Sequence, residues 1–191
     1  MIITIEGGDQ AGKKTQSQLL SNALFKKRIK TKIFNFPDYT TPVGKEIDRY
    51  LHGKRSYPPQ VIHCLLAANR WEKLNEIKKA NSKNSVVIMN RYYESNFVYG
   101  LVNGMNLDWL ESLDKGLPKS NLVIVLDVTQ KESFVRKKSQ RDRFEKNKDF
   151  SQKVSKTYRL LAKRFGWKLV DASGTKQEIH YSIMKIVSKR L

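Results

Sequence analysis

The sequence has little of what would place a protein outside the cell or in a membrane. Its 191 residues include one cysteine, Cys64, so no internal disulfide can form, and this fits a reducing cytoplasm. No apolar run approaches the length needed to cross a membrane. The first strand is predicted directly at the amino terminus, which leaves no room for a signal peptide. We therefore expect a cytoplasmic protein.

Histidine and cysteine are also too sparse to predict a zinc site or a nucleophilic catalytic set. Cys64 and the three histidines lack metal-ligand spacing. Cys64 lies in an apolar helical pattern, which favours packing in the core over reactivity. No internal repeat or low-complexity linker interrupts the chain. Its length predicts one domain, residues 1–191, with a substantial core.

Acidic residues are scarce relative to basic ones. The chain has 18 aspartate and glutamate residues against 37 lysine and arginine residues, which gives a formal net charge of +19. Such an excess attracts nucleotides, nucleic acids and anionic surfaces. A lysine-rich solvated surface, a bias also seen in thermophiles, would have the same composition. Charge alone therefore does not separate these possibilities.

The amino-terminal stretch carries the strongest functional signal. An apolar run at residues 2–5 leads into a glycine-rich loop, and a helix is predicted from Lys13. Gly7, Gly12 and Lys13 have the spacing of G-x-x-x-x-G-K-[ST], which in this strand–loop–helix context predicts a phosphate-binding loop. Backbone N–H groups would surround an anion at the positive end of the helix, with Lys13 as the phosphate-binding lysine. The alternative is an ordinary turn that contains several glycines.

The loop departs from this pattern at its last position. The pattern ends in a serine or threonine whose hydroxyl binds Mg²⁺. Position 14 is a lysine, and the ammonium group of Lys14 cannot ligate a metal. Thr15, one place later, supplies the only nearby hydroxyl. The metal ligands are therefore unknown, with Thr15 as a possible one.

Short apolar segments alternate with helical patterns along the chain. Strands are predicted at residues 2–5, 31–36, 86–89, 122–126 and 168–170. Helices are predicted at about 13–28, 42–52, 60–80 (the longest), after 93, 150–165 and 176–190. This alternation predicts an α/β fold with a parallel sheet covered on both faces. Ligands in such sheets bind beyond the carboxyl ends of the strands, where this chain has polar residues.

Two arginines and one basic segment are further candidates for chemistry. Arg70 either reaches from its helix into the cleft to hold a base or phosphate, or is a surface arginine. Arg91 directly follows a buried strand, where it would meet transferring phosphoryl oxygens, or it pairs with Glu94. Residues 136–145 are dense in cations and form either a lid that closes over a nucleotide or a solvated helix face.

These residues lie in motifs that resemble those of the thymidylate kinases, a branch of the nucleoside monophosphate kinases. The motifs follow the family's order at residues 6–13, 36–38, 41–44, 68–72, 91–92, 116–119, 142–145 and 170–173. The resemblance implies a P-loop NTPase fold with a five-stranded parallel sheet in the order 2-3-1-4-5, a lid at about 136–149, and a homodimer. It implies in-line transfer of the γ-phosphoryl group of ATP to dTMP with Mg²⁺, which gives dTDP for dTTP synthesis.

The resemblance also implies roles for residues at matching positions. The ATP site would comprise Gly7, Gly8, Asp9, Gln10, Ala11, Gly12, Lys13, Lys14, Thr15 and Arg136. The dTMP site would comprise Asp9, Phe36, Tyr39, Leu66, Arg70, Arg91 and Tyr99. In it Asp9 would meet the sugar 3′-hydroxyl, Arg70 the thymine carbonyl, and Tyr99 the 2′ carbon. Catalysis would depend on Asp9, Lys13, Arg91 and the lid residues Arg141 and Arg143.

Five residues depart from the family's pattern. Lys14 replaces the metal-binding hydroxyl, and Asn90 replaces an acid that supports the metal site. Tyr39 stands where many members have an arginine on the dTMP phosphate. Leu66 stands where a phenylalanine often stacks on thymine, a contact worth roughly 1–3 kcal/mol. Gln10 stands where some members have a loop arginine, a loss that a basic lid would compensate.

Three hypotheses remain open at this point. Lys14 partly substitutes for metal charge, and the protein is a kinase with altered metal dependence. Alternatively, the chain is a catalytically weakened homologue that binds nucleotide only. Less favoured is a basic nucleic-acid-binding protein, whose duplex binding would fall steeply with salt. The set Asp9, Lys13, Arg70 and Arg91 argues against it, because binding to a phosphate backbone needs no such set.

Overall fold

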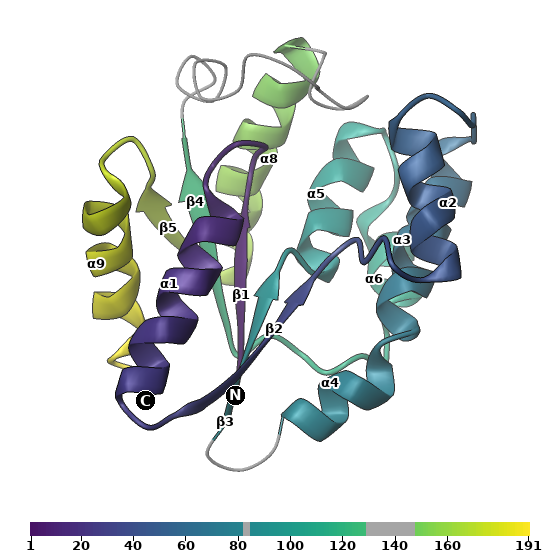
Figure 1. Cartoon of the computed structure of the whole chain (residues 1–191). Coiled ribbons are helices and arrows are strands. Elements are labelled where there is room, and N and C mark those ends of the chain that lie inside the picture. The colour runs from purple at the N-terminus through teal and green to yellow at the C-terminus, as the bar shows by residue number, and fades with distance from the viewer. Residues whose placement is uncertain (82–84, 129–147) are drawn as a thin grey trace.

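The strands form one parallel sheet. In the computed structural model, which describes residues 1–81, 85–128 and 148–191, the strand order is β2-β3-β1-β4-β5 (Figure 1). The strands are β1 (Ile2–Gly7), β2 (Lys30–Asn35), β3 (Ser85–Asn90), β4 (Leu122–Asp127) and β5 (Lys168–Asp171). This is the order that the resemblance implied, and it confirms the predicted α/β fold.

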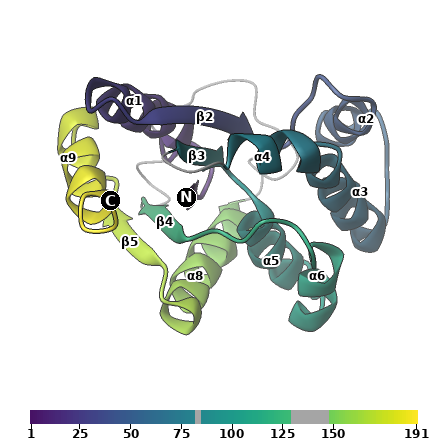
Figure 2. The same cartoon turned by 90° about the horizontal axis from the view of Figure 1, so that it is seen from below.

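Helices cover both faces of the sheet. They are α1 (Lys13–Lys26), α2 (Pro42–Leu51), α3 (Pro59–Trp71), α4 (Leu74–Ala80), α5 (Tyr93–Val102), α6 (Leu107–Leu113), α8 (Lys148–Phe165) and α9 (Lys176–Val187). One face is covered by α1 and α9, and the other by α4, α5 and α8 (Figures 1 and 2). The helices α2 and α3 pack on each other beside α5. No helix in the described ranges is both long and apolar enough to span a membrane.

The alternation of side chains along β1 explains why it lies at the centre. Ile3 and Ile5 point to the face covered by α1, where they pack in a cluster with Leu20. Glu6 points to the opposite face, toward α5 and α8. Strand β3 pairs with one edge of β1 and β4 pairs with the other, so β1 is buried along its whole length. The loop that follows β1 is therefore held at the middle of the carboxyl edge of the sheet.

The helix predicted at 60–80 is two helices, so this prediction was wrong. The break follows Trp71, where the Lys73 N–H donates to the Arg70 carbonyl oxygen, three residues back, at 3.1 Å. Lys73 then takes φ −97° and ψ 2°, and α4 begins at Leu74. The apolar spacing continues through Leu74 and Ile77, which hides the break in the sequence. The longest helix in the described part of the chain is α8.

The prediction that Cys64 packs in the core is also wrong. Cys64 is exposed on α3. The buried side of this helix includes polar side chains, His63, Asn69 and Arg70, in addition to Ile62. Apolar spacing alone therefore misplaced the buried side of α3.

Candidate functional site

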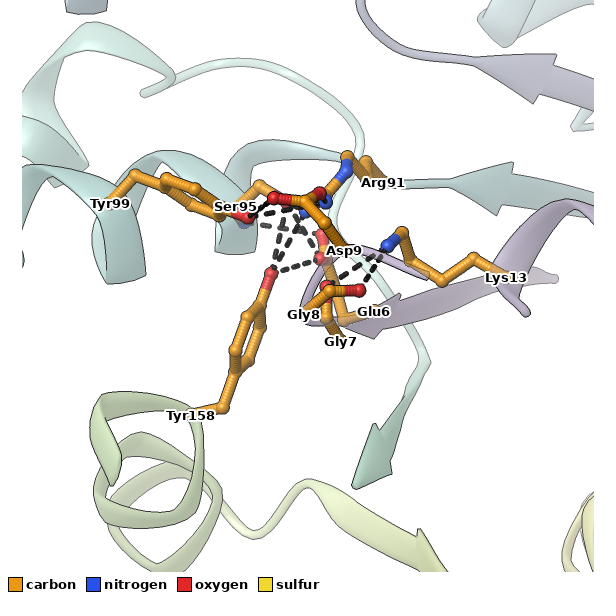
Figure 3. A network of polar contacts seen from close by, with 9 residues as sticks. All are labelled: Glu6, Gly7, Gly8, Asp9, Lys13, Arg91, Ser95, Tyr99 and Tyr158. Carbon is orange, nitrogen blue, oxygen red and sulfur yellow. Dashed lines mark hydrogen bonds and ion pairs between the residues drawn. The ribbon is translucent and has the colours of Figure 1, made fainter. Parts of the chain in front are cut away.

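The loop between β1 and α1 has the geometry of a phosphate-binding loop. Gly7 takes φ +141°, and a Cβ there would lie 2.6 Å from the Leu126 carbonyl oxygen, so a side chain would clash with β4. Helix α1 begins after Gly12, and no side chain caps its first turn. Such N–H groups at a helix start bind anions. Lys13 turns back over the loop, where its Nζ donates to the carbonyl oxygens of Gly7 at 3.1 Å and Gly8 at 2.6 Å (Figure 3).

A cavity opens beside this loop, and we call it the loop cavity. It is lined by Asp9, Gln10, Gly12, Lys13, Lys14, Thr15, Phe36, Asn90 and Arg91. These include most of the residues expected to hold ATP. Three others, Gly7, Gly8 and Ala11, belong to the loop itself. Arg136, Arg141 and Arg143 lie outside the described residues, as does most of the expected lid.

A second, mostly apolar cavity lies next to the first, and we call it the deep pocket. Every residue expected to bind dTMP lines it: Asp9, Phe36, Tyr39, Leu66, Arg70, Arg91 and Tyr99. It is completed by residues that sequence reasoning did not assign: Pro37, Ile47, Leu51, Ile62, Tyr92, Ser95 and Asn96. The structure thus brings together all of the residues expected to bind dTMP, from segments far apart in the chain, around one cavity.

The two cavities share Asp9, Phe36 and Arg91. Arg91 follows β3 with a left-handed backbone, φ +63°, and its guanidinium forms an ion pair with Asp9 (Figure 3). It also donates to the hydroxyl oxygens of Ser95 at 3.1 Å and Tyr99 at 3.2 Å. The alternative pairing of Arg91 with Glu94 is not what the structure has. An arginine is therefore fixed where the two cavities meet.

Asp9 and Arg91 keep their charges in this arrangement. Burial alone would raise the pKa of Asp9, but Arg91, Lys13 and a hydrogen bond from Tyr99 together lower it. Burial likewise opposes the charge of Arg91, yet Tyr99 and Asp9 hold its pKa well above the ordinary value. The junction of the two cavities therefore holds a carboxylate and a guanidinium at neutral pH.

Glu6 positions the start of α5 on the sheet, and sequence reasoning missed it. The Glu6 side chain is fully buried and accepts hydrogen bonds from the backbone N–H of Tyr92 at 2.9 Å and of Ser95 at 3.2 Å. The hydroxyls of Ser95 and Tyr158 also donate to it, at 2.6 and 2.7 Å (Figure 3). Tyr158, from α8, accepts in turn from Arg91 at 3.3 Å. A carboxylate in a strand whose other side chains are apolar apart from Thr4 was the available signal.

Arg70 is neither exposed nor unpartnered. Its Nε and Nη2 donate to the two carboxylate oxygens of Asp114 at 2.8 and 2.7 Å, and both side chains are 3% exposed. Asp114 follows α6, 44 residues from Arg70, so no local pattern links them. This pair holds the planar guanidinium in one orientation at the wall of the deep pocket.

Glu94 is buried near Glu6, and it makes stability depend on pH. Burial and the charge of Glu6 raise the pKa of Glu94 from 4.5 to about 8. The folded chain therefore retains a proton that the unfolded chain releases above pH 4.5. Because the folded-state pKa is raised, this contribution to stability is complete below about pH 4.5 and is lost as pH rises toward 8, by up to about 1.4 kcal/mol per pH unit.

Replacing Glu94 with glutamine should remove this pH dependence. Relative to the unmodified chain, Glu94→Gln is expected to gain unfolding free energy steadily from pH 5 to pH 8, as measured by urea denaturation. The exposed residue Glu111, on α6, provides the control. The unfolding free energy of Glu111→Gln should differ from that of the unmodified chain by the same amount at pH 5 and at pH 8. Parallel pH curves for Glu94→Gln and the unmodified chain would contradict the raised pKa.

The loop cavity does not fit a metal ion held by protein ligands. Mg²⁺ binds through one or two carboxylates together with phosphates and water. Among the described residues that line this cavity, Asp9 is the one carboxylate, and it is paired with Arg91. Lys13 and Lys14 line the same space, and Thr15 offers one neutral oxygen beside them. Within the described ranges, no group of three or more histidine, cysteine, aspartate or glutamate residues could hold a metal.

Comparison with known proteins gives the family. The thymidylate kinase family model matches residues 5–183. The chain is 38% identical to thymidylate kinase of Schizosaccharomyces pombe, over 98% of this chain and 91% of that protein. It is 33% identical to thymidylate kinase of Homo sapiens, over 95% and 87%. The structure of thymidylate kinase from Candida albicans superposes with a TM-score of 0.88 at 30% identity, covering 99% of this chain and 91% of that one. The chain therefore belongs to the thymidylate kinase family.

Proposed function

We propose that this chain transfers the γ-phosphoryl group of ATP, the family's co-substrate, to dTMP, and so produces ADP and dTDP. The observation that carries the proposal is the junction of the two cavities at Asp9, Phe36 and Arg91. A triphosphate on the phosphate-binding loop and a nucleotide in the deep pocket would place their phosphates on opposite sides of Arg91. This is the arrangement that in-line phosphoryl transfer requires.

The chain's own residues would act by positioning and by charge. A phosphate oxygen of dTMP bonds to the γ-phosphorus as the bond from that phosphorus to the bridging oxygen of ADP breaks, without a covalent enzyme intermediate. Lys13 and the loop N–H groups hold the phosphates of ATP. Arg91 contacts the dTMP phosphate and the transferring group. The family resemblance also implies roles for Arg136, Arg141 and Arg143, which lie outside the described residues.

The deep pocket would hold the thymidine moiety of dTMP. Phe36 and Leu66 form apolar walls for the base. Asp114 accepts from Nε and Nη2 of Arg70, and we assign the remaining Nη1 group to the thymine carbonyl. Asp9 accepts from the 3′-hydroxyl. The ring of Tyr99 lies against the 2′ carbon and disfavours a ribose hydroxyl there.

The remaining expectations belong to the same proposal. We take residues 1–191 as one catalytic domain, which works as a homodimer in the cytoplasm and supplies dTDP for dTTP synthesis. The family resemblance also implies Mg²⁺ beside the phosphates of ATP. Because the residues of the loop cavity do not fit that ion, we assign no step to it.

The test is release of ADP from ATP with and without dTMP. We expect release that depends on dTMP and saturates with it, and little release from ATP alone. Titration with dUMP and with ribonucleoside monophosphates then measures the selectivity of the deep pocket. If ATP and dTMP both bind but no monophosphate promotes release, the chain is a nucleotide-binding homologue and the proposed activity is wrong.

A further inference from the structure

We infer that Lys14 takes the place of the metal ion in the phosphate-binding loop, so that this chain binds ATP in its metal-free form. This inference rests on the proposed ATP site. In a phosphate-binding loop the residue after the conserved lysine ligates Mg²⁺ through its hydroxyl, at the β- and γ-phosphates. Here that residue is Lys14, in the first turn of α1, and it lines the loop cavity. The side chain at the position that normally binds Mg²⁺ is thus itself a cation.

The end of β3, the strand beside the loop, also lacks the group that would support a metal ion. The second protein support for Mg²⁺ in phosphate-loop enzymes is an aspartate. In this chain β3, which pairs with β1 residue by residue as far as Ile5, ends at Asn90. Asn90 lines the loop cavity together with Lys14. Its Nδ2 donates to Asn35 Oδ1 at 2.9 Å, and its buried Oδ1 accepts no hydrogen bond from the described residues. A neutral amide stands where a carboxylate would attract a divalent ion.

The charges of the cavity favour an anion and disfavour a metal ion. Lys13 lines the cavity as a buried residue and Lys14 as an exposed one, while the carboxylate of Asp9 is paired with Arg91. A divalent cation entering this space would meet like charges, and among the described residues that line the cavity it would find no carboxylate other than that of Asp9. ATP without its metal carries more negative charge, which these groups complement. An ammonium group is a compact charge with three donors, suited to several phosphate oxygens at once.

This assignment leaves the bonding changes of phosphoryl transfer as they are. The negative charge that develops on the bridging oxygen of ADP would be stabilised by Lys13 and Lys14, and no further co-reactant is needed. One ammonium carries half the charge of Mg²⁺. Because Lys14 stands at the metal position, the unmodified chain should prefer metal-free ATP to its magnesium complex. A chain with serine at position 14 should prefer the complex.

Calorimetric titration of ATP into the full chain, in a chelator and in excess Mg²⁺, tests the inference without relying on turnover. The unmodified chain should bind ATP at least as tightly in chelator as in Mg²⁺. Lys14→Ser should lose at least tenfold in affinity in chelator and recover much of it with Mg²⁺, which inverts the ratio of the two Kd values. Lys14→Arg, which keeps the charge, should retain binding in chelator. Lys27→Ser removes one exposed charge from the far end of α1 and should keep the original ratio.

The outcomes separate this inference from the proposed function. Binding by the unmodified chain that disappears in chelator and returns with Mg²⁺ overturns the role of Lys14, whether or not ADP is released in response to dTMP. An unchanged ratio in Lys14→Ser overturns it as well. Failure of ATP to bind under both conditions removes the proposed ATP site, and with it the proposed function. Thermal unfolding of each variant verifies that it is folded.

Discussion

Replacing Arg91 with methionine is expected to lower kcat/KM for dTMP by about 10³-fold, which is the scale of losing an arginine that stabilises a transferring phosphoryl group. Arg91 lines both cavities, and its guanidinium is fixed by Asp9, Ser95 and Tyr99. Methionine keeps much of the side-chain length and removes the charge. In a steady-state assay of ADP release, kcat should fall because the contact to the transferring group is lost, and KM for dTMP should rise because the contact to its phosphate is lost.

The control for this experiment is an arginine outside both cavities. Arg164 lies on the last turn of α8, where its guanidinium stacks on the Phe165 ring at 5.5 Å. Arg164→Met removes the same charge from the protein and should leave kcat/KM within about twofold, an effect of under 1 kcal/mol. An Arg91→Met variant that keeps the kcat of the unmodified chain would show that the transferring group does not lie at this junction.

Replacing Asp114 with alanine should lower the free energy of unfolding by about 3–5 kcal/mol. In the unmodified chain the side chains of Arg70 and Asp114 are both 3% exposed. The substitution therefore leaves the guanidinium of Arg70 buried and without its bidentate partner. An uncompensated buried charge costs more than the ion pair itself contributes. Urea denaturation measures the loss. It should be accompanied by weaker dTMP binding, because the orientation of Arg70 at the pocket wall would no longer be fixed.

Two further variants show whether the buried charge is the cause. Asp108 is exposed in the first turn of α6, and Asp108→Ala should change stability by no more than about 0.5 kcal/mol. The double variant Arg70→Met, Asp114→Leu removes both charges and should regain most of the stability, but not the affinity for dTMP. If the double variant is as unstable as Asp114→Ala, lost packing rather than a lone charge explains the effect.

What could be predicted from the sequence depends on local patterns. The apolar alternation along the chain was enough for the α/β fold, and Gly7, Gly12 and Lys13 were enough for the loop. The sheet order and the members of the deep pocket came from family motifs, not from spacing. All of the expected residues line one cavity in the structure. Their roles toward a ligand remain predictions.

The contacts that no local pattern encodes could not be predicted. Arg70 and Asp114 meet across 44 residues, and Glu6 and Tyr158 across 152. Each polar partner alone is an unremarkable residue, and only the fold brings it to the other. The break after Trp71 was missed for a different reason, because the apolar spacing continues on both sides of it. Long-range polar pairing thus sets the orientation of the site residues.

The central place of β1 has a consequence for synthesis of the chain on the ribosome. Strand β1 is made before β3 and β4, the strands that pair with it in the described part of the chain, so both partners are complete only once residue 127 has emerged. Ile2, Ile3 and Ile5 therefore lie on a strand with two open edges until β3 is complete at residue 90, and with one open edge until β4 is complete. Pairing over such separations makes closure of the sheet slow. A chain that is truncated before β4 would therefore expose an apolar strand, and we expect it to depend on chaperones or to be degraded.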